Sequence, residues 1–177
     1  LRMREIVPTL QKLWKGDYAH DGKYFQFPST TSIPKPLQDN GPPIWIAARD
    51  PNSHEFAIAN DWDVQVTPLW KGFDEIERLK NIFDDICTKY SDKPKPLSMV
   101  LNHCYIGNND DDIQKGAVAV SKFYNNFGAW FKNNRSVVQG TMDPLTQEEI
   151  DNNEMCSPNQ MKKNQNIGTL NEVIDNI

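Results

Sequence analysis

The chain has 177 residues, of which 38% are apolar and 24% are charged, and its formal net charge is −5. This length and composition are those of a globular chain with a buried core, and they exclude a disordered or low-complexity segment. The acidic balance lacks the basic surface of nucleic-acid-binding proteins, and no apolar run reaches the length of a membrane span or signal peptide. We therefore expect neither nucleic acid nor a membrane among the partners of this protein.

The cysteines indicate a reducing compartment. Cys87, Cys104 and Cys156 are odd in number and lack the spacing of metal ligands, and the three histidines have no such spacing either. We therefore expect reduced thiols in a cytoplasmic protein without a metal site. We interpret Cys104 as a residue packed in the core.

In chain order, the first predicted element is an amphipathic helix over residues 1–14, with Pro8 inside the pattern. The Asp21-Gly22 pair predicts a turn before a short strand at residues 24–27. Residues 28–43 are rich in proline, serine and threonine, which predicts a stiff, extended connector.

Residues 42–67 are the stretch with the clearest pattern. Residues 44–48 form an apolar run without polar alternation, which is typical of a strand covered on both faces. A polar turn follows, then a short helix for which Ser53 is the predicted N-cap, then a second strand at residues 64–67. This order predicts a βαβ unit, and its turn lies at the strand end where parallel α/β proteins bind ligands.

The next segments continue the alternation of helix and strand. Residues 73–90 have the apolar spacing of a helix, residues 97–106 that of a third strand, and a further helix begins at residue 110. We interpret its acidic start as a solvated helix end and not as a cation site. Its aromatic stripe is typical of a core or an interface and comprises Phe123, Phe127, Trp130 and Phe131.

The C-terminal part is less regular. We expect a loop at residues 133–140, a helix start at Thr146, and weak structure in the polar segment 152–165. Thr169 and Glu172 have the spacing of a capping box, which predicts a last helix. Helical spacing without caps reaches both ends of the chain, so we expect that both ends cut through helices.

Several segments of the chain form an ordered combination. They are residues 22–27 (GKYFQF), 34–38 (PKPLQ), 42–48 (PPIWIAA), Ser53 with the alanine-rich helix after it, 167–169 (IGT) and 171–174 (NEVI). In this order they resemble the luciferase-like flavin-dependent monooxygenases, the bacterial luciferase-like family. The resemblance extends over nearly the whole chain and is specific as an ordered combination.

The resemblance implies an α/β fold, a (β/α)8 TIM barrel of which this chain is one partial domain, residues 1–177. The predicted strands would be about the fifth to the seventh, followed by the helical insertion of the family. The implied reaction oxidises a small organic substrate with O2 and reduced FMN, or in one branch a deazaflavin, and a flavin reductase supplies the reduced cofactor. The chain would then lack the usual catalytic residues and be inactive alone.

The resemblance also implies cofactor-binding residues. The turn after the first strand of the βαβ unit matches the family segment at the flavin phosphate, and the implied residues are Arg49, Asp50, Asn52, Ser53 and Thr67. A helix N-terminus attracts anions, and Arg49 would add a charge-assisted contact, whereas Asp50 suits an anion site only if it orients Arg49 or caps the helix. The alternative is that Ser53 only caps the helix and Arg49 forms a surface ion pair.

Two other functional classes remain open. A non-catalytic α/β module would bind a phosphorylated ligand at the same turn, and a barrel enzyme of unrelated chemistry would share only the fold. We interpret His103, a single histidine in the third predicted strand, as a core or rim residue and not as a catalytic one. Because a partial barrel leaves strand edges unpaired, we also expect self-association as a homo-oligomer.

Overall fold

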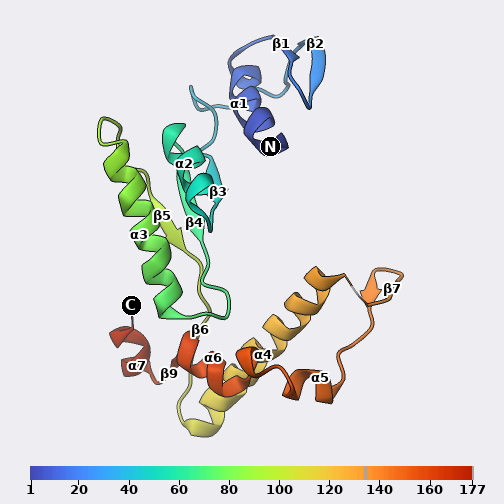
Figure 1. The fold of residues 1–177 in the computed structure, drawn as a ribbon, viewed down its shortest axis with the longest axis vertical. Coiled ribbons are helices and arrows are strands. Elements are labelled where there is room, and N and C mark those ends of the chain that lie inside the picture. Colours follow the sequence, from blue (N-terminus) through green and yellow to red (C-terminus); the bar gives the residue numbers. More distant parts are fainter. Residues whose placement is uncertain (134, 177) are drawn as a thin grey trace. The chain divides into compact units, whose positions relative to one another are not determined.

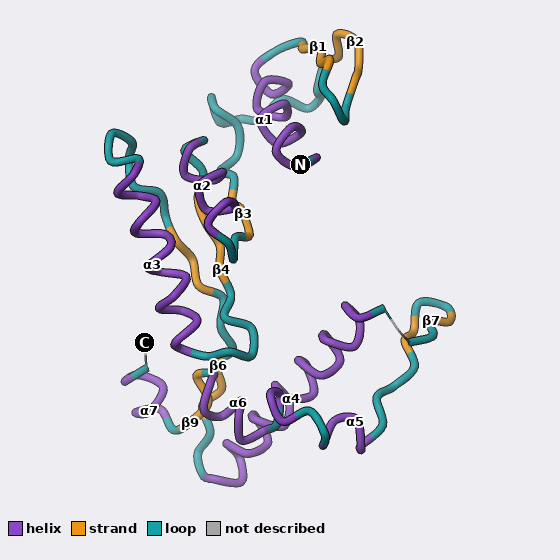
Figure 2. Tube along the Cα trace, in the orientation of Figure 1, coloured by secondary structure: helices purple, strands orange, loops and turns teal. Residues whose placement is uncertain are grey.

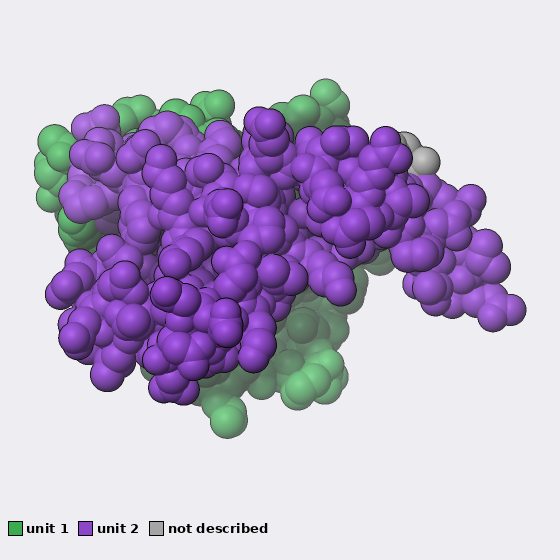
Figure 3. All heavy atoms as spheres, turned by 90° about the horizontal axis from the view of Figure 1, so that it is seen from below, with its two compact units in different colours: residues 1–64, 86–97 green, residues 65–85, 98–177 purple. Residues whose placement is uncertain are grey.

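The computed structural model describes residues 1–133 and 135–176. Helices and strands alternate along the chain (Figures 1 and 2), and the chain divides into two compact units, which are coloured separately in Figure 3. One unit comprises Leu1–Val64 and Ile86–Leu97, and the other comprises Gln65–Asp85 and Ser98–Ile177. Within the described residues, no helix combines the length and the apolar content that a membrane span requires.

The first unit begins with helix α1, Arg2–Lys15, which contains Pro8 as predicted. A hairpin follows, in which β1, Tyr18–Asp21, pairs antiparallel with β2, Gln26–Thr30. The predicted turn at Asp21-Gly22 is therefore confirmed, but the predicted strand at residues 24–27 begins only at Gln26. Its partner strand has no regular alternation of apolar residues, which is why the sequence did not predict it.

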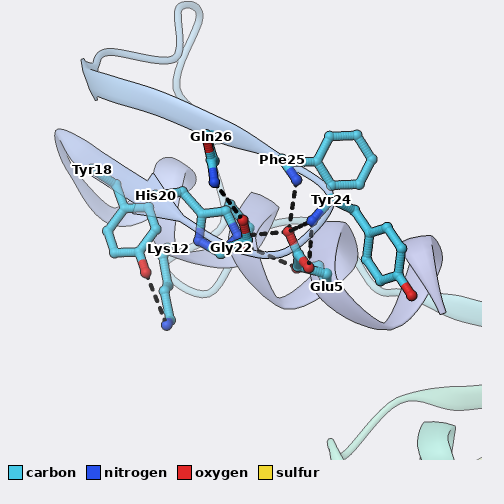
Figure 4. Close-up of polar contacts among 9 residues, drawn as sticks. Glu5, Lys12, Tyr18, His20, Gly22, Tyr24, Phe25 and Gln26 are labelled. Carbon is cyan, nitrogen blue, oxygen red and sulfur yellow. Dashed lines mark hydrogen bonds and ion pairs between the residues drawn. The ribbon is translucent and has the colours of Figure 1, made fainter.

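The Glu5 side chain ties α1 to this hairpin (Figure 4). Its carboxylate accepts hydrogen bonds from the N–H groups of Tyr24 and Phe25, at 3.1 and 2.8 Å, and lies 3.2 Å from Nε2 of His20. Partial burial would raise the pKa of Glu5, but these donors outweigh burial, and the pKa lies below its usual value. The carboxylate is thus ionised at neutral pH and satisfies two backbone groups at the hairpin turn.

The predicted βαβ unit is confirmed. Strand β3, Trp45–Ala47, leads into helix α2, Pro51–Ala59, which leads into β4, Asp63–Val66. Together with β5, Ser98–Val100, these strands form a sheet in the order β3-β4-β5. In the first unit, the buried residues that hold α2 on its strands are Ile46, Ala48, Phe56, Ala57, Ile58, Trp62 and Val64, and the rings of Phe56 and Trp62 meet edge to face at 5.2 Å.

The helix predicted at residues 73–90 is also present as α3, Phe73–Lys89. The single strand predicted at residues 97–106 is wrong, because β5 ends at Val100 and a separate strand, β6, spans Cys104–Ile106. Between them, the N–H of His103 donates to the side-chain oxygen of Asn102 at 2.9 Å, a local bond that competes with strand pairing. Strand β6 instead pairs in parallel with β9, Asn166–Gly168, in a second sheet.

Helix α4, Asp110–Lys132, is the longest helix of the second unit, and Asn109 caps it. A short hairpin follows, with β7, Val137–Val138, antiparallel to β8, Thr141–Met142. This hairpin lies within the predicted loop 133–140 and just beyond it; Asn134 lies outside the described residues.

The C-terminal segment is more ordered than the sequence predicted. Helix α5, Gln147–Asp151, and helix α7, Leu170–Asp175, both begin with the capping boxes of Thr146 and Thr169, as expected. The prediction of weak structure at residues 152–165 is wrong, because a 3-10 turn, Glu154–Cys156, and helix α6, Pro158–Asn164, form there. Too few apolar residues lie in this segment to give a helical period, but two of them, Cys156 and Met161, are buried in the core beside α4.

The core of the second unit lies where α4, α6 and β9 meet. Its buried residues are Ile113, Ala117, Val120, Tyr124, Cys156, Met161 and Ile167, and Leu69, Trp70 and Tyr105 pack against them. The core cysteine is therefore Cys156, and the prediction of a buried Cys104 is wrong, because Cys104 is exposed. In a strand this short, the alternation of faces turns Cys104 outward, while the neighbouring Tyr105 reaches the core.

Two glycines of α4 provide a matched pair of substitutions. A Cβ at Gly116 would overlap the ring of Tyr105, whose hydroxyl is held by Asp112 at 3.0 Å, whereas a Cβ at Gly128 would meet nothing within 4 Å. We expect Gly116→Ala to lower the free energy of unfolding by about 1–3 kcal/mol through overpacking. Gly128→Ala should raise it by about 0.5–1 kcal/mol, because alanine favours a helix over glycine. Urea denaturation of both variants measures the difference, and equal effects would contradict the packing at Gly116.

Candidate functional site

The turn between β3 and α2 has the geometry of a capped helix start, but the cap is Asp50 and not Ser53. The Asp50 carboxylate accepts from the Ser53 N–H at 3.1 Å and from the Ser53 hydroxyl at 2.6 Å, and Pro51 is the first helical residue. The prediction of Ser53 as N-cap is therefore wrong by three residues. Proline is favoured at the first helical position, and that places the cap directly before it.

The hydrogen-bond donors of this turn all point to the carboxylate of Asp50. The Ser53 hydroxyl, with the N–H groups of Ser53 and Asn52, holds the pKa of Asp50 below its usual value against the opposing effect of partial burial. These three donors are the ones that a phosphate would use at a helix N-terminus. A phosphate therefore fits this donor set only when the Asp50 carboxylate has turned away from it.

Two further residues that the sequence did not predict hold the turn. Arg4 of α1 donates to the carbonyl oxygen of Asn52 at 2.7 Å, and its guanidinium lies 4.9 Å from the centre of the Phe56 ring. His54 is fully buried, and its Nδ1 donates to the carbonyl oxygen of Asp50 at 3.0 Å. The Arg4 contact joins residues that are 48 positions apart in the chain, so no local sequence pattern predicts it.

The predicted site residues do not all lie at this turn. Arg49 lies two residues after the end of β3 and is half-buried, next to Asp50, Asn52 and Ser53 in the first unit. Thr67 belongs to the second unit, where its hydroxyl accepts from the Leu69 N–H at 3.2 Å. Trp45 of β3 is partly exposed, whereas Trp70, three residues after Thr67, packs against the core of the second unit.

Thr67 lines a pocket of about 200 Å³ in the second unit, together with His103. The pocket is formed by the segment after β4, the link between β5 and β6, and one face of α4. Its lining residues are Thr67, Leu69, Leu101, Asn102, His103, Phe123, Tyr124 and Phe127.

Aromatic rings dominate the pocket. The rings of His103, Phe123 and Tyr124 meet pairwise at centroid distances of 5.0, 5.1 and 5.2 Å, with interplanar angles of 61°, 82° and 74°. Three planes at such angles form a corner, and Phe127 extends it by stacking on Phe123 at 5.7 Å. The aromatic stripe of α4 is thus divided: Phe123 and Phe127 line the pocket, while Trp130 and Phe131 lie on the exposed surface beyond it.

Burial sets the protonation of two pocket side chains. Burial lowers the pKa of His103 below the usual value of an imidazole, so the ring is neutral at neutral pH. Burial, followed by the proximity of Cys156, raises the pKa of Tyr124 to about 12. The pocket therefore presents uncharged aromatic side chains at neutral pH.

The buried amide of Gln165 holds the rim of the pocket, and the sequence did not predict it. Its Nε2 donates to the carbonyl oxygen of Leu69 at 2.7 Å, and its Oε1 accepts from the His103 N–H at 3.4 Å. The neighbouring Asn164 donates to the carbonyl oxygen of Trp70 at 2.7 Å. A glutamine flanked by polar residues reads as a surface residue, so only the tertiary contacts reveal this role.

Two curated proteins are similar to this chain in sequence. The chain is 50% identical over 176 residues to the oxygenase component of a flavin-dependent trigonelline monooxygenase from Acinetobacter baylyi, an alignment that covers 99% of this chain and 49% of that protein. It is 25% identical over 160 residues to the uncharacterized protein y4vJ of Sinorhizobium fredii, covering 90% of this chain and 45% of the relative. The chain therefore spans about half the length of the curated relatives it matches.

A family model extends this similarity to every residue of the chain. The model describes luciferase-like monooxygenases and matches residues 1–177. The resemblance found in the sequence is therefore confirmed: the chain belongs to the luciferase-like monooxygenase family.

Proposed function

We propose that the protein carrying this chain is the oxygenase of a two-component flavin-dependent monooxygenase, and that this chain forms part of its (β/α)8 barrel. The observation that carries the proposal is the 50% identity to an oxygenase component over 99% of the chain, within a family match of full length. A separate reductase would supply the reduced flavin. The cytoplasm, where the thiols of Cys87, Cys104 and Cys156 remain reduced, is the proposed location.

The proposed cofactor is FMN, which supplies the electrons for the activation of O2 when it is bound in its reduced form. The residues of this chain would bind it by its phosphate at the start of α2, through the N–H groups of Asn52 and Ser53 and the Ser53 hydroxyl. Arg49 would add a charge-assisted contact. Asp50 would act as an exchangeable cap that holds these donors in place until the phosphate replaces its carboxylate.

The proposed substrate class follows from the named relative. Trigonelline is a pyridinium ring with an N-methyl group and a carboxylate, and we propose an N-methylated heteroaromatic substrate of this kind. The aromatic pocket of the second unit suits a flat ring, and Thr67 and His103 are among its lining residues. Neutral aromatic walls exclude water from such a ring without opposing its charge.

The phosphate proposal predicts that the protein discriminates FMN from riboflavin. We expect FMN to bind at least about tenfold more tightly, because hydrogen bonds to a charged group contribute about 1.5–3 kcal/mol each. Asp50→Asn should increase this preference, since asparagine caps a helix as well as aspartate but removes the competing negative charge. Ser53→Ala should reduce the preference by removing one donor. Flavin-fluorescence titration of the unmodified protein and of both variants, each with FMN and with riboflavin, measures the six affinities.

Asp111→Asn, at the start of α4, changes the net charge equally and is the control. Equal affinities for FMN and riboflavin in the unmodified protein would remove the phosphate role of this turn. Binding of inorganic phosphate without flavin-dependent oxidation of any substrate would instead support the alternative of a non-catalytic module. Self-association remains a prediction from the sequence, and light scattering tests it.

A further inference from the structure

We propose that the pocket lined by His103, Phe123, Tyr124 and Phe127 is a subsite for an N-alkylated cationic ring, with Asn102 as its hydrogen-bond donor to an acceptor group on that ring. The inference assigns residues of this chain to the substrate and rests on the proposed function for the substrate class. It concerns binding and can be tested without turnover.

The first argument is the arrangement of the rings. His103, Phe123 and Tyr124 form a corner of three aromatic planes at centroid distances of 5.0–5.2 Å, and Phe127 continues one wall. A cation near the faces of several aromatic rings is stabilised by their quadrupoles, and aromatic cages of this type recognise quaternary nitrogen. A neutral apolar ligand would need only aliphatic walls, and Leu69 and Leu101 form only a minor part of the pocket lining.

The second argument is the charge of the lining. None of the described residues that line the pocket is a lysine, an arginine or a carboxylate. No cation therefore repels a positively charged ligand, and no carboxylate binds it so strongly that aromatic contacts become irrelevant. His103 is neutral at neutral pH because burial lowers its pKa, so it acts as a further aromatic wall.

The third argument is an unused donor. The Nδ2 atom of Asn102 is buried and has no hydrogen-bond acceptor among the described residues, although the Oδ1 atom of the same amide accepts from the His103 N–H at 2.9 Å. A buried donor without an acceptor destabilises the protein unless a ligand satisfies it. The terminal torsion of asparagine is soft, so the amide of this lining residue can turn its donor toward a ligand carboxylate.

The test is calorimetric titration of the complete protein that carries this chain, with and without saturating FMN, using trigonelline, N-methylpyridinium and nicotinate. We expect trigonelline to bind more tightly than nicotinate, which has the same ring and carboxylate but no N-methyl group and no fixed ring charge. Phe127→Leu and Phe123→Leu should each weaken the binding of trigonelline and of N-methylpyridinium by roughly 3- to 30-fold. Phe127→Tyr retains the aromatic face and should bind nearly as well as the unmodified protein.

Trp130→Leu is the control, because Trp130 is an exposed aromatic residue on the same helix and outside the pocket lining, whereas the ring of Phe131 packs on Phe127 at 4.6 Å. We expect no change in affinity for this variant. Asn102→Ala should weaken the binding of trigonelline by roughly 3- to 10-fold and leave the binding of N-methylpyridinium unchanged. Of these two ligands, only trigonelline has a carboxylate that can accept the hydrogen bond. Circular dichroism of each variant establishes that it is folded.

Three results would overturn the inference. They are the absence of binding of both cationic rings at millimolar concentration, equal affinity for trigonelline and nicotinate, and equal effects of Phe127→Leu and Trp130→Leu. The proposed function is judged separately by oxidation of trigonelline with reduced FMN and O2. If Phe127→Leu oxidises trigonelline with an unchanged KM, the pocket is not the substrate subsite, but the proposed function stands. If the expected binding pattern is found without oxidation, the subsite stands, but the proposed function is wrong.

Discussion

Met161→Ala is expected to lower the free energy of unfolding by about 2–5 kcal/mol, the largest effect among the substitutions considered. Met161 is fully buried between α4 and β9, in the core that also supports Leu69 and Tyr105. Truncation removes apolar burial and leaves a cavity, because neighbouring helices collapse only partly onto it. Urea denaturation of the complete protein measures this loss.

Met155→Ala provides the matched control for this prediction. Met155 lies in the 3-10 turn before α6, and 64% of its surface is exposed, so its truncation removes little buried area. We expect a change within about 0.5 kcal/mol. Similar losses for the two variants would mean that α6 does not pack on α4 as described.

Tyr124 is expected to make the protein sensitive to alkali. Burial, followed by the proximity of Cys156, raises the pKa of Tyr124 to about 12, whereas an unfolded tyrosine titrates near pH 10. Because the folded-state pKa is the higher one, the stabilisation is complete below about pH 10 and is lost as the pH rises toward 12. The difference corresponds to about 2–3 kcal/mol of unfolding free energy.

In the Tyr124→Phe variant, this pH-dependent loss of stability should be absent, since phenylalanine does not ionise. We therefore expect its free energy of unfolding to fall less than that of the unmodified protein between pH 10 and 12. Tyr24→Phe, in the hairpin of the first unit, is the control. If Tyr124→Phe and the unmodified protein lose stability in parallel over this range, the phenol is not buried as described. Ultraviolet titration of tyrosinate gives the pKa independently.

Most helices were predictable because their signals are local. The apolar spacing of α1, α3 and α4 and the capping boxes at Thr146 and Thr169 lie within single segments of the sequence. The βαβ unit was predictable for the same reason, since an unbroken apolar run, a polar turn and a helix start follow one another. The family was predictable from the order of such segments, and its match over residues 1–177 confirms it.

The candidate site was predictable only in part. The sequence located the turn at the start of α2, but Asp50 takes the cap that was predicted for Ser53, because the competition between neighbouring side chains for the same N–H groups is decided by geometry. Arg4 supports this turn from another helix. Whether the turn binds a flavin phosphate remains a proposal, which the comparison of FMN with riboflavin tests.

The tertiary structure alone decided the pocket and the strand pairing around it. The pocket combines residues of three separate segments, near Thr67, His103 and Phe123, and Gln165 holds its rim from a fourth. The parallel pairing of β6 with β9 joins residues about sixty positions apart, and it divides the strand predicted at residues 97–106. Local propensity carries no information about such partners, because the energy of a strand pair or a buried amide comes from contacts that exist only in the folded chain.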